Sequence, residues 1–151
     1  MSKNKILKKV KFSVIIPIYN RSFELNNLLK SFQYQILKEF EVIIIDDGSE
    51  EDILSVINNF SDLNINYFRI KNSERGKARN IGFLKSSGMY LNFFDSDDIA
   101  LKNHYQEALR IIYEQKYPDI FHFSYHGAHH GAPSFSIFAL CSQSRNFFTV
   151  I

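Results

Sequence analysis

The stretch Leu91-Asn92-Phe93-Phe94-Asp95-Ser96-Asp97-Asp98 joins an apolar run to three carboxylates within four residues. The run from Met89 to Phe94 is short, aromatic and preceded by Gly88, a pattern that predicts a buried strand. Carboxylates at the carboxyl end of a buried strand lie where α/β sheets bind ligands. Because three neighbouring acids repel one another, a divalent cation that prefers oxygen ligands, Mg²⁺ or Mn²⁺, would stabilise them. The simpler interpretation is that they cap the helix that follows.

Further apolar runs predict four more strands, at Phe12–Ile18, Phe40–Ile45, Asn64–Ile70 and Ile120–Tyr125. We expect the first strand to end near Pro17, which has no N–H for the ladder. Between the strands, apolar residues at helical spacing predict helices with these buried faces: Leu25, Leu28, Leu29 and Phe32; Ile53, Leu54, Ile57 and Phe60; Ala78, Ile81 and Leu84; Leu101, Tyr105, Ala108, Leu109 and Ile112. Ser22 and Ser49 are expected to cap the first two helices. This alternation is typical of the α/β class, here an open, mostly parallel sheet with helices on both faces.

Polar loops follow three of these strands, at Pro17–Asn20, Asp46–Ser49 and Asp95–Asp98. Right-handed crossovers between parallel strands place such loops along one edge of the sheet. We therefore expect one ligand site there. Neither the G-x-G-x-x-G pattern nor the P-loop pattern follows any strand, which excludes ordinary dinucleotide binding and P-loop phosphoryl transfer.

Several side chains near this edge suit a nucleotide. Asp47 could accept a hydrogen bond from a base or ribose, and Tyr19 could stack on a base. Arg75 and Arg79 stand four residues apart, so they share a helix face and together suit a diphosphate. The plainer alternatives are helix capping by the acid, loop packing by the tyrosine and a solvated face for the arginines.

Composition limits the class of protein. At 151 residues with a net charge of +2, the chain is expected to form one domain and not to be a dedicated nucleic-acid binder. We divide it into a basic tail at 1–11, a globular domain at 12–125 and an irregular segment at 126–151. The tail is expected to be solvated, with contact to an anionic membrane surface as the alternative. The single Cys141 excludes an internal disulfide. No apolar run approaches the ~20 residues of a membrane span. We therefore expect a cytoplasmic protein, with a location at the inner face of the membrane as a further option.

Four segments in this chain resemble the successive signatures of family-2 glycosyltransferases, in the order and spacing of that family: residues 14–20, 45–49, 75–82 and 94–98. The resemblance implies the GT-A fold and an inverting transfer from a nucleotide-diphosphate sugar, commonly a UDP-sugar, to a glycan, lipid-linked or protein acceptor. It also suggests a role in the assembly of a bacterial-type surface polysaccharide.

The resemblance implies a role for each matching residue on the nucleotide side. Pro17 and Tyr19 would line the base pocket, and Asp47 would accept a hydrogen bond from the base. Arg75 or Arg79 would face the nucleotide.

On the acidic side, the resemblance implies that Asp95 approaches the ribose or the sugar and that Ser96 belongs to the same nucleotide-sugar site. Asp97, together with Asp98, would bind Mn²⁺ or Mg²⁺. That cation would neutralise the charge that develops on the leaving nucleoside diphosphate.

The chain departs from the family pattern after Asp119, beyond which no Asp or Glu occurs. In the family, an Asp or Glu on the acceptor half removes the proton of the acceptor hydroxyl, so the catalytic base is not identified here. We expect a fragment or truncated form that binds the donor. A non-catalytic nucleotide-binding remnant is the alternative to an active enzyme.

Two other classes share an acidic turn after a strand. A phosphatase of the haloacid dehalogenase type would need Thr or Val where Ile99 stands. A response-regulator receiver domain would need a lysine where Ser124-Tyr125 stands.

The spacing of His122, His126, His129 and His130 matches no established zinc pattern.

Overall fold

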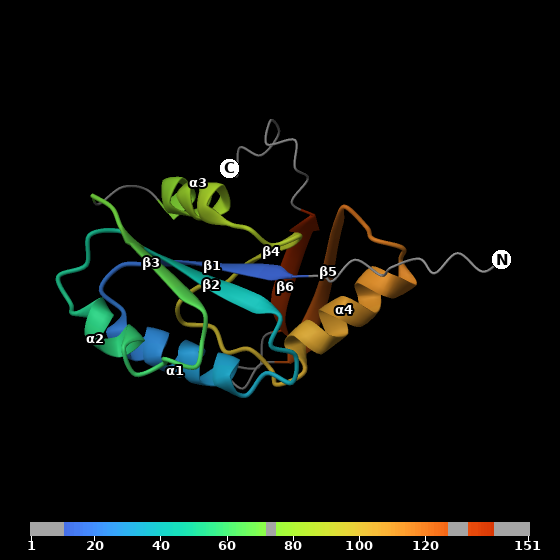
Figure 1. Cartoon of the computed structure of the whole chain (residues 1–151), viewed down its shortest axis with the longest axis horizontal. Coiled ribbons are helices and arrows are strands. Elements are labelled where there is room, and N and C mark those ends of the chain that lie inside the picture. Colours follow the sequence, from blue (N-terminus) through green and yellow to red (C-terminus); the bar gives the residue numbers. More distant parts are fainter. Residues whose placement is uncertain (1–10, 72–74, 127–132, 141–151) are drawn as a thin grey trace.

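The computed structural model describes residues 11–71, 75–126 and 133–140, with the backbone alone for Arg75, 123–126 and 133–140. Within these residues, six strands form one sheet in the order β3-β2-β1-β4-β6-β5, accompanied by four helices (Figure 1). The strands are β1 Phe12–Ile18, β2 Phe40–Asp46, β3 Ile65–Arg69, β4 Tyr90–Phe93, β5 Ile120–His126 and β6 Pro133–Leu140. The helices are α1 Ser22–Gln33, α2 Ile53–Ile57, α3 Arg75–Lys85 and α4 His104–Glu114.

The parallel part of the sheet is centred on β1, which pairs with β2 on one side and β4 on the other, while β2 pairs with β3. Every residue of β1 and β2 is buried, which explains why both strands are mostly apolar in sequence, with Ser13, Glu41 and Asp46 as the polar exceptions. The predicted open, mostly parallel sheet is therefore confirmed. The first strand spans Phe12–Ile18, as predicted, and ends close to Pro17; beyond it, Asp47 N donates a hydrogen bond to Ile18 O at 2.8 Å.

Helices cover both faces of the sheet (Figure 1). On one face α1, α2 and α4 pack over the larger core, to which α1 contributes the predicted Leu25, Leu28, Leu29 and Phe32. On the other face α3 packs over a smaller core through Ala78 and Phe83. At the carboxyl ends of β1, β2 and β4, the chain continues as loops.

The buried face of α3 differs from the prediction. Leu84 is 59% exposed, whereas Phe83 is buried. The helix approaches β1 closely at Gly82, where a Cβ would overlap the side chain of Ile15. A residue two positions beyond Gly82 is rotated by about 200° around the helix and therefore faces solvent.

The predicted helix starts also need correction. Arg21, not Ser22, is the N-cap residue of α1, and its side chain makes no capping hydrogen bond. Asp52, not Ser49, caps α2 by accepting a hydrogen bond from Ser55 N at 3.1 Å. Leu101 precedes α4 and is exposed, so it does not belong to the buried face of that helix.

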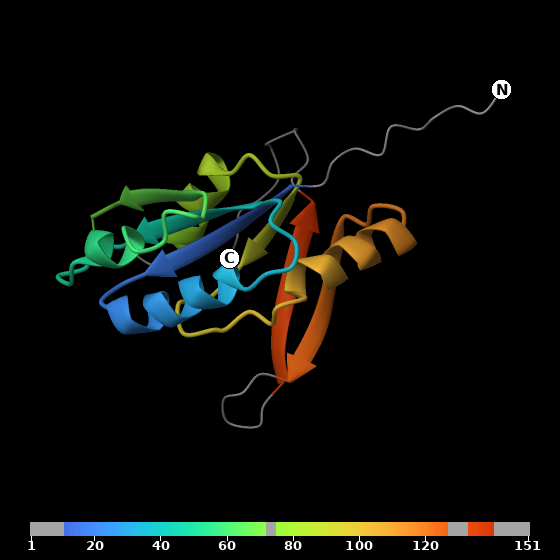
Figure 2. The same ribbon diagram turned by 60° about the horizontal axis from the view of Figure 1, so that its bottom comes forward.

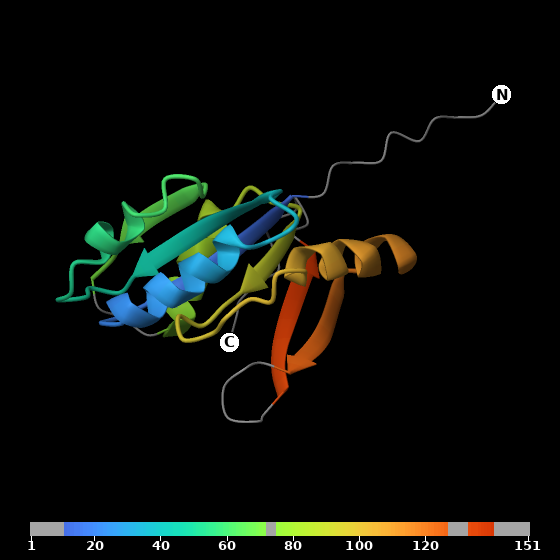
Figure 3. The same ribbon diagram turned by 90° about the horizontal axis from the view of Figure 1, so that it is seen from below.

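The segment beyond Tyr125 is not irregular throughout, contrary to the prediction. Strand β6 lies between β4 and β5 and is antiparallel to both. Figures 2 and 3 show β5 and β6 together at one end of the sheet, beside α4. The predicted basic tail, apart from Lys11, and residues 127–132 and 141–151 lie outside the described part of the chain.

None of the helices that the structure describes has both the length and the apolar character needed to cross a membrane.

Candidate functional site

The loops that follow β1, β2 and β4 meet at one edge of the sheet, as the sequence predicts. Phe94 N donates a hydrogen bond to Ile15 O at 3.1 Å, which sets the end of β4 beside β1. Arg21, in the loop after β1, forms an ion pair with Asp97, in the loop after β4, at 2.6 Å. We refer to this edge, formed by residues 17–21, 46–51 and 95–98, as the acidic rim.

Asn20 ties the first loop of the acidic rim to the second. Its N–H donates to Ser49 Oγ at 3.0 Å, and its side-chain Oδ1 accepts from Glu50 N at 2.7 Å. Asn20 has a φ of 49°, a left-handed conformation that asparagine tolerates better than most residues. The neighbouring Tyr19 is 46% exposed, so its ring lies at the surface beside the second loop.

Asp46 stabilises the second loop from inside. Its Oδ1 accepts from Ser49 N at 2.8 Å, and its Oδ2 accepts from the hydroxyl of Tyr67 at 2.6 Å. Burial alone would raise the pKa of Asp46, but these hydrogen bonds and the nearby Arg69 lower it overall. The same environment, with burial as the largest cause, raises the pKa of Tyr67 to about 12. Asp46 is thus a structural acid with both oxygens engaged.

Arg69 completes this support from the end of β3. Its Nη2 donates to Ser49 O at 2.6 Å, and its Nε lies 3.9 Å from Asp46 Oδ2. Asp47, the second acid of the pair, is buried, and its backbone N–H bonds to β1. Asp46 and Asp47 therefore have different surroundings in the structure, a difference that the sequence alone does not reveal.

The third loop carries the acids that follow β4. Asp95 Oδ1 accepts from Arg79 Nη2 at 2.8 Å, and Asp98 Oδ2 accepts from Asp95 N at 3.2 Å. Burial, followed by the charges of Asp95 and Asp97, raises the pKa of Asp98 despite its hydrogen bond to the backbone. Ser96 is buried within the turn. The repulsion predicted from sequence is therefore present in the folded chain.

A buried polar group lies beneath this turn. His104, the first residue of α4, is within 3.1 Å of Asn92 Oδ1 through its Nε2, and Tyr105 donates to the same oxygen at 3.2 Å. Burial lowers the pKa of His104 to about 3, so its ring is neutral at physiological pH. The ring packs edge-on against Phe94, which immediately precedes the acids. These residues support the turn from the core.

The structure places most of the predicted site residues at the acidic rim. Pro17 is buried at the end of β1, and Arg79 reaches the rim from α3. Arg75 begins α3, but its side chain lies outside the described part of the chain, so its predicted role stays a prediction.

The sequence reasoning missed Arg21, in the acidic rim, and Tyr67 and Arg69, which support the rim from β3. It placed Asn20 in a loop at this edge but gave its side chain no role. A usable signal existed for the two on β3, because Tyr67 and Arg69 stand two residues apart near the carboxyl end of a predicted strand. For Arg21, whose partner stands 76 residues later, no local pattern gives the pairing.

The chemistry of the rim suits an anionic ligand accompanied by a cation. Among the described residues, no group of three or more His, Cys, Asp or Glu side chains converges to hold a metal ion alone. Mg²⁺ and Mn²⁺ are commonly held by only one or two carboxylates together with the phosphates of a substrate. The oxygens of Asp97 and Asp98 fit that partial set of ligands.

The comparisons with known proteins agree with this geometry. The sequence profile of Glycosyl transferase family 2 matches residues 13–138. An uncharacterized glycosyltransferase of Rickettsia bellii is 43% identical over 113 residues, which cover 74% of this chain and 16% of that protein. The GalNAc(5)-diNAcBac-PP-undecaprenol beta-1,3-glucosyltransferase of Campylobacter jejuni is 39% identical over 95 residues, covering 60% of this chain and 31% of that enzyme.

Solved structures give the same result. Residues 1–349 of TarS from S. aureus, in complex with UDP-GlcNAc, superpose with a TM-score of 0.68 at 34% identity, over 73% of this chain and 33% of that one. The mannosyltransferase PcManGT of Pyrobaculum calidifontis shares the fold, with a TM-score of 0.63 at 18% identity, over 68% of this chain and 32% of that one. The chain therefore spans a third or less of each of these four proteins. It has the GT-A fold and belongs to glycosyl transferase family 2.

Proposed function

We propose that this domain binds a nucleotide-diphosphate sugar, specifically a UDP-sugar, and that its sugar is transferred with inversion to an acceptor hydroxyl. The observation that carries the proposal is the meeting of three loops at the acidic rim, joined by Arg21–Asp97 and Asn20–Ser49 contacts. The related TarS structure was solved in complex with UDP-GlcNAc, which supports a UDP-sugar donor for this chain.

The nucleobase of the donor is assigned to the loops after β1 and β2. Following the resemblance, we assign Asp47 to the nucleobase. Asp46, whose two oxygens both accept hydrogen bonds within the protein, is assigned a structural role. The exposed Tyr19 offers a ring for stacking on the nucleobase, and the buried Pro17 is assigned to the same pocket. The Asn20 and Tyr67 hydrogen bonds hold these loops in place before the ligand arrives.

The diphosphate is assigned to the region between α3 and the turn after β4. Arg79 is held at the rim by Asp95, and its planar guanidinium is suited to phosphate oxygens. Asp97 and Asp98 would hold Mn²⁺ or Mg²⁺ there, and the bound cation would neutralise charge on the departing nucleoside diphosphate. Asp95 and Ser96 are assigned to the ribose or the sugar.

The acceptor is proposed from the relatives. The name of the Campylobacter enzyme describes an undecaprenol-linked acceptor, and that of TarS describes poly(ribitol-phosphate). We propose a glycan or lipid-linked acceptor of this kind, in the assembly of a bacterial surface polymer. Inversion requires a base on the side of the sugar opposite the leaving group, and no described residue is assigned that role.

The donor site is tested by calorimetric titration of UDP into the chain, with and without Mn²⁺. Binding should depend on Mn²⁺, and Asp97→Asn should weaken it by about tenfold or more, equivalent to about 1.4 kcal/mol. Asp119→Asn is the matched control, because Asp119 is exposed and precedes β5, and it should bind as the unaltered chain does. Equal binding by Asp97→Asn would refute the metal assignment, and no UDP binding by a cooperatively folded chain would refute the donor site.

A further inference from the structure

Arg21 is the one residue of the β1–α1 loop whose side chain is shown to reach the acids after β4. Its Nη1 lies 2.6 Å from Asp97 Oδ2, although the two residues are 76 positions apart in sequence. Both side chains are partly open to solvent, at 36% for Arg21 and 55% for Asp97. The pair is therefore short enough to be a charge-assisted hydrogen bond and open enough to be exchanged.

We propose that Arg21 couples cation binding to donor binding: its guanidinium occupies Asp97 in the ligand-free chain and moves to the diphosphate when the cation and the donor enter together. This inference rests on the proposed function, because it takes Asp97 as the cation-binding acid. It assigns to Arg21 a positioning role that the resemblance does not include.

The electrostatics of the pair favour such an exchange. A divalent cation that approaches Asp97 alone meets a positive charge already bonded to that carboxylate. Binding the cation then requires Arg21 to leave its partner without gaining another, which weakens the binding of the cation alone.

The diphosphate removes this obstacle. Its oxygens can serve as ligands of the cation and as acceptors for the guanidinium fork. Only the complex with both ligands therefore compensates for the broken ion pair. The two ligands should assist each other by the same factor, because coupling between two sites is reciprocal.

The local structure lets the side chain of Arg21 move while its backbone stays fixed. Ser22 N donates to Glu51 Oε2 at 2.7 Å, and Leu25 N donates to Arg21 O at 3.0 Å. Together with the Asn20 contacts, these bonds anchor the chain on both sides of the arginine. Glu51 faces the same loop, and its carboxylate is engaged by Ser22, whose hydrogen bonds lower its pKa.

Arg79 differs from Arg21 in its partner. It pairs with Asp95, which we assign to the ribose or sugar, and its side chain is less exposed, at 27%. Removing Arg79 should therefore weaken UDP binding without freeing the cation-binding acid. This contrast separates loss of a phosphate contact from loss of coupling.

The experiment measures three affinities for each protein: Mn²⁺ alone, UDP alone, and UDP at saturating Mn²⁺. We expect Arg21→Gln to bind Mn²⁺ alone about fivefold more tightly and to lose about tenfold of the assistance that Mn²⁺ gives to UDP. Arg21→Lys keeps a positive charge at this position and should restore most of the exclusion of Mn²⁺. Arg110→Gln makes the same change of charge on α4, where Arg110 pairs with Glu107 and Glu114, and should match the unaltered chain.

The outcomes distinguish this inference from the proposed function. If the unaltered chain shows Mn²⁺-dependent UDP binding and Arg21→Gln retains both affinities, the coupling role is wrong and the donor site stands. If Arg21→Gln binds Mn²⁺ alone no better than Arg110→Gln, the coupling role is also wrong. If the unaltered, folded chain binds neither ligand, the proposed function and this inference fail together.

Discussion

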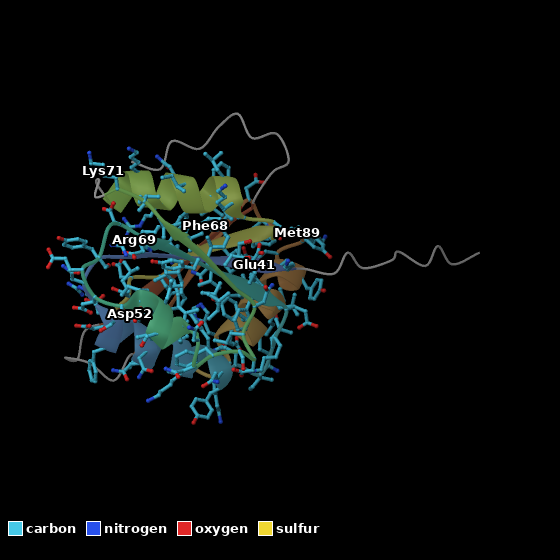
Figure 4. All side chains as sticks on the ribbon, turned by 60° about the vertical axis from the view of Figure 1, so that its left-hand side comes forward. Glu41, Asp52, Phe68, Arg69, Lys71 and Met89 are labelled. Atoms are coloured by element: carbon cyan, nitrogen blue, oxygen red, sulfur yellow. The ribbon has the colours of Figure 1, made fainter. Side chains whose placement is uncertain are left out.

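The two ends of the parallel strands hold carboxylates in opposite ways. At the amino ends, Glu41 is 5% exposed, and its Oε1 accepts from Ser13 Oγ at 2.6 Å and Ser87 N at 2.7 Å. At the carboxyl ends, the acids Asp95 and Asp97 are open to solvent. Figure 4 shows Glu41 beside Met89 at one end of the sheet and Arg69 with Lys71 toward the other.

The partners of these acids explain the difference. Two serine hydroxyl groups and a backbone N–H hold Glu41 Oε1 at 2.6 to 2.8 Å, and the longer Lys11 lies farther away, 3.7 Å from Oε2. Long arginines from other elements hold Asp95 and Asp97, and these side chains can turn away at small cost to the fold. Burial with short donors therefore marks a structural acid, whereas exposure with a long cationic partner marks an acid that can take a ligand. Changes at the amino ends should reduce stability, and changes at the acidic rim should reduce binding.

The largest loss of stability is expected from Gly88→Ala. A Cβ at Gly88 would lie 2.6 Å from Ser13 N and 2.8 Å from the carbonyl carbon of Phe12, so the backbone itself would have to shift. We expect the free energy of unfolding to fall by about 3 kcal/mol, measured by guanidinium denaturation. Leu84→Ala, at an exposed position nearby in sequence, is the control and should change it by about 0.5 kcal/mol or less. A loss below about 1 kcal/mol for Gly88→Ala would show that this edge tolerates rearrangement.

The next effect is expected from Glu41→Gln, which leaves buried donors facing an amide. We expect the free energy of unfolding to fall by about 2 kcal/mol, while the affinity for UDP stays unchanged. Glu114→Gln removes an exposed acid from α4 and should have little effect on either quantity. A loss of UDP affinity in folded Glu41→Gln would contradict the separation of the two ends.

Tyr67→Phe sharpens the comparison, because Asp46 is a structural acid that lies at the acidic rim. Removing the hydroxyl that donates to Asp46 at 2.6 Å should lower the free energy of unfolding by about 1 kcal/mol. It should also weaken UDP binding, since the loop that carries Asp47 loses a support. Tyr113→Phe, at an exposed tyrosine of α4, provides the baseline for both measurements. Unchanged stability and affinity in Tyr67→Phe would show that Ser49 and Arg69 hold the loop without it.

The smallest effect is a pH dependence of opposite sign at the two ends. Burial raises the pKa of Glu41, but hydrogen bonds from Ser13 and Ser87, with Lys11 nearby, lower it overall from 4.5. Its contribution to stability is therefore present above 4.5 and is lost as the pH falls through the lower pKa of the folded state. The pKa of Asp98 is raised, mainly by burial, so its ionised form destabilises the fold, and lowering the pH through that pKa relieves the cost.

Unfolding curves recorded at several pH values below neutrality test both signs. Asp98→Asn should be more stable than the unaltered chain near neutral pH, and this advantage should disappear as the pH falls toward 3.8, the ordinary pKa of the group. Glu41→Gln should be less stable at neutral pH, and its deficit should shrink as the pH falls below 4.5. Parallel curves for the two variants would show that neither acid has a shifted pKa.

The sequence was sufficient for the parallel half of the fold because β1 and β2 are buried on both faces and the loops that follow β1, β2 and β4 are polar. It failed for β6, whose run from Pro133 to Leu140 alternates at Phe135 and Ile137 and then becomes continuously apolar. Such a mixed run satisfies neither the pattern of a half-buried strand nor that of a fully buried one. The position of β6 between β4 and β5 is a pairing between distant segments, which local patterns do not encode.

The candidate site shows the same limit. The acids were identifiable because they directly follow apolar runs, and their meeting followed from the topology of a parallel sheet. The partners were not, because Arg21 and Tyr67 find their carboxylates across loops and neighbouring strands. Asp46 and Asp47 are identical in type and adjacent in sequence, so the structural role of Asp46 is evident only from the contacts that the fold gives it with Ser49, Tyr67 and Arg69.

The insertion of β6 also sets an order of events while the chain is being made. Strand β4 ends at Phe93, but its second neighbour is complete only at Leu140, 47 residues later (140 minus 93). At ribosomal rates of roughly 5–20 residues per second, synthesis of these residues takes about 2 to 9 seconds, during which one edge of β4 is unpaired. During that interval the nascent chain exposes a strand edge that can pair with other chains, so chaperone binding or slow translation near this point would most affect the yield of folded protein.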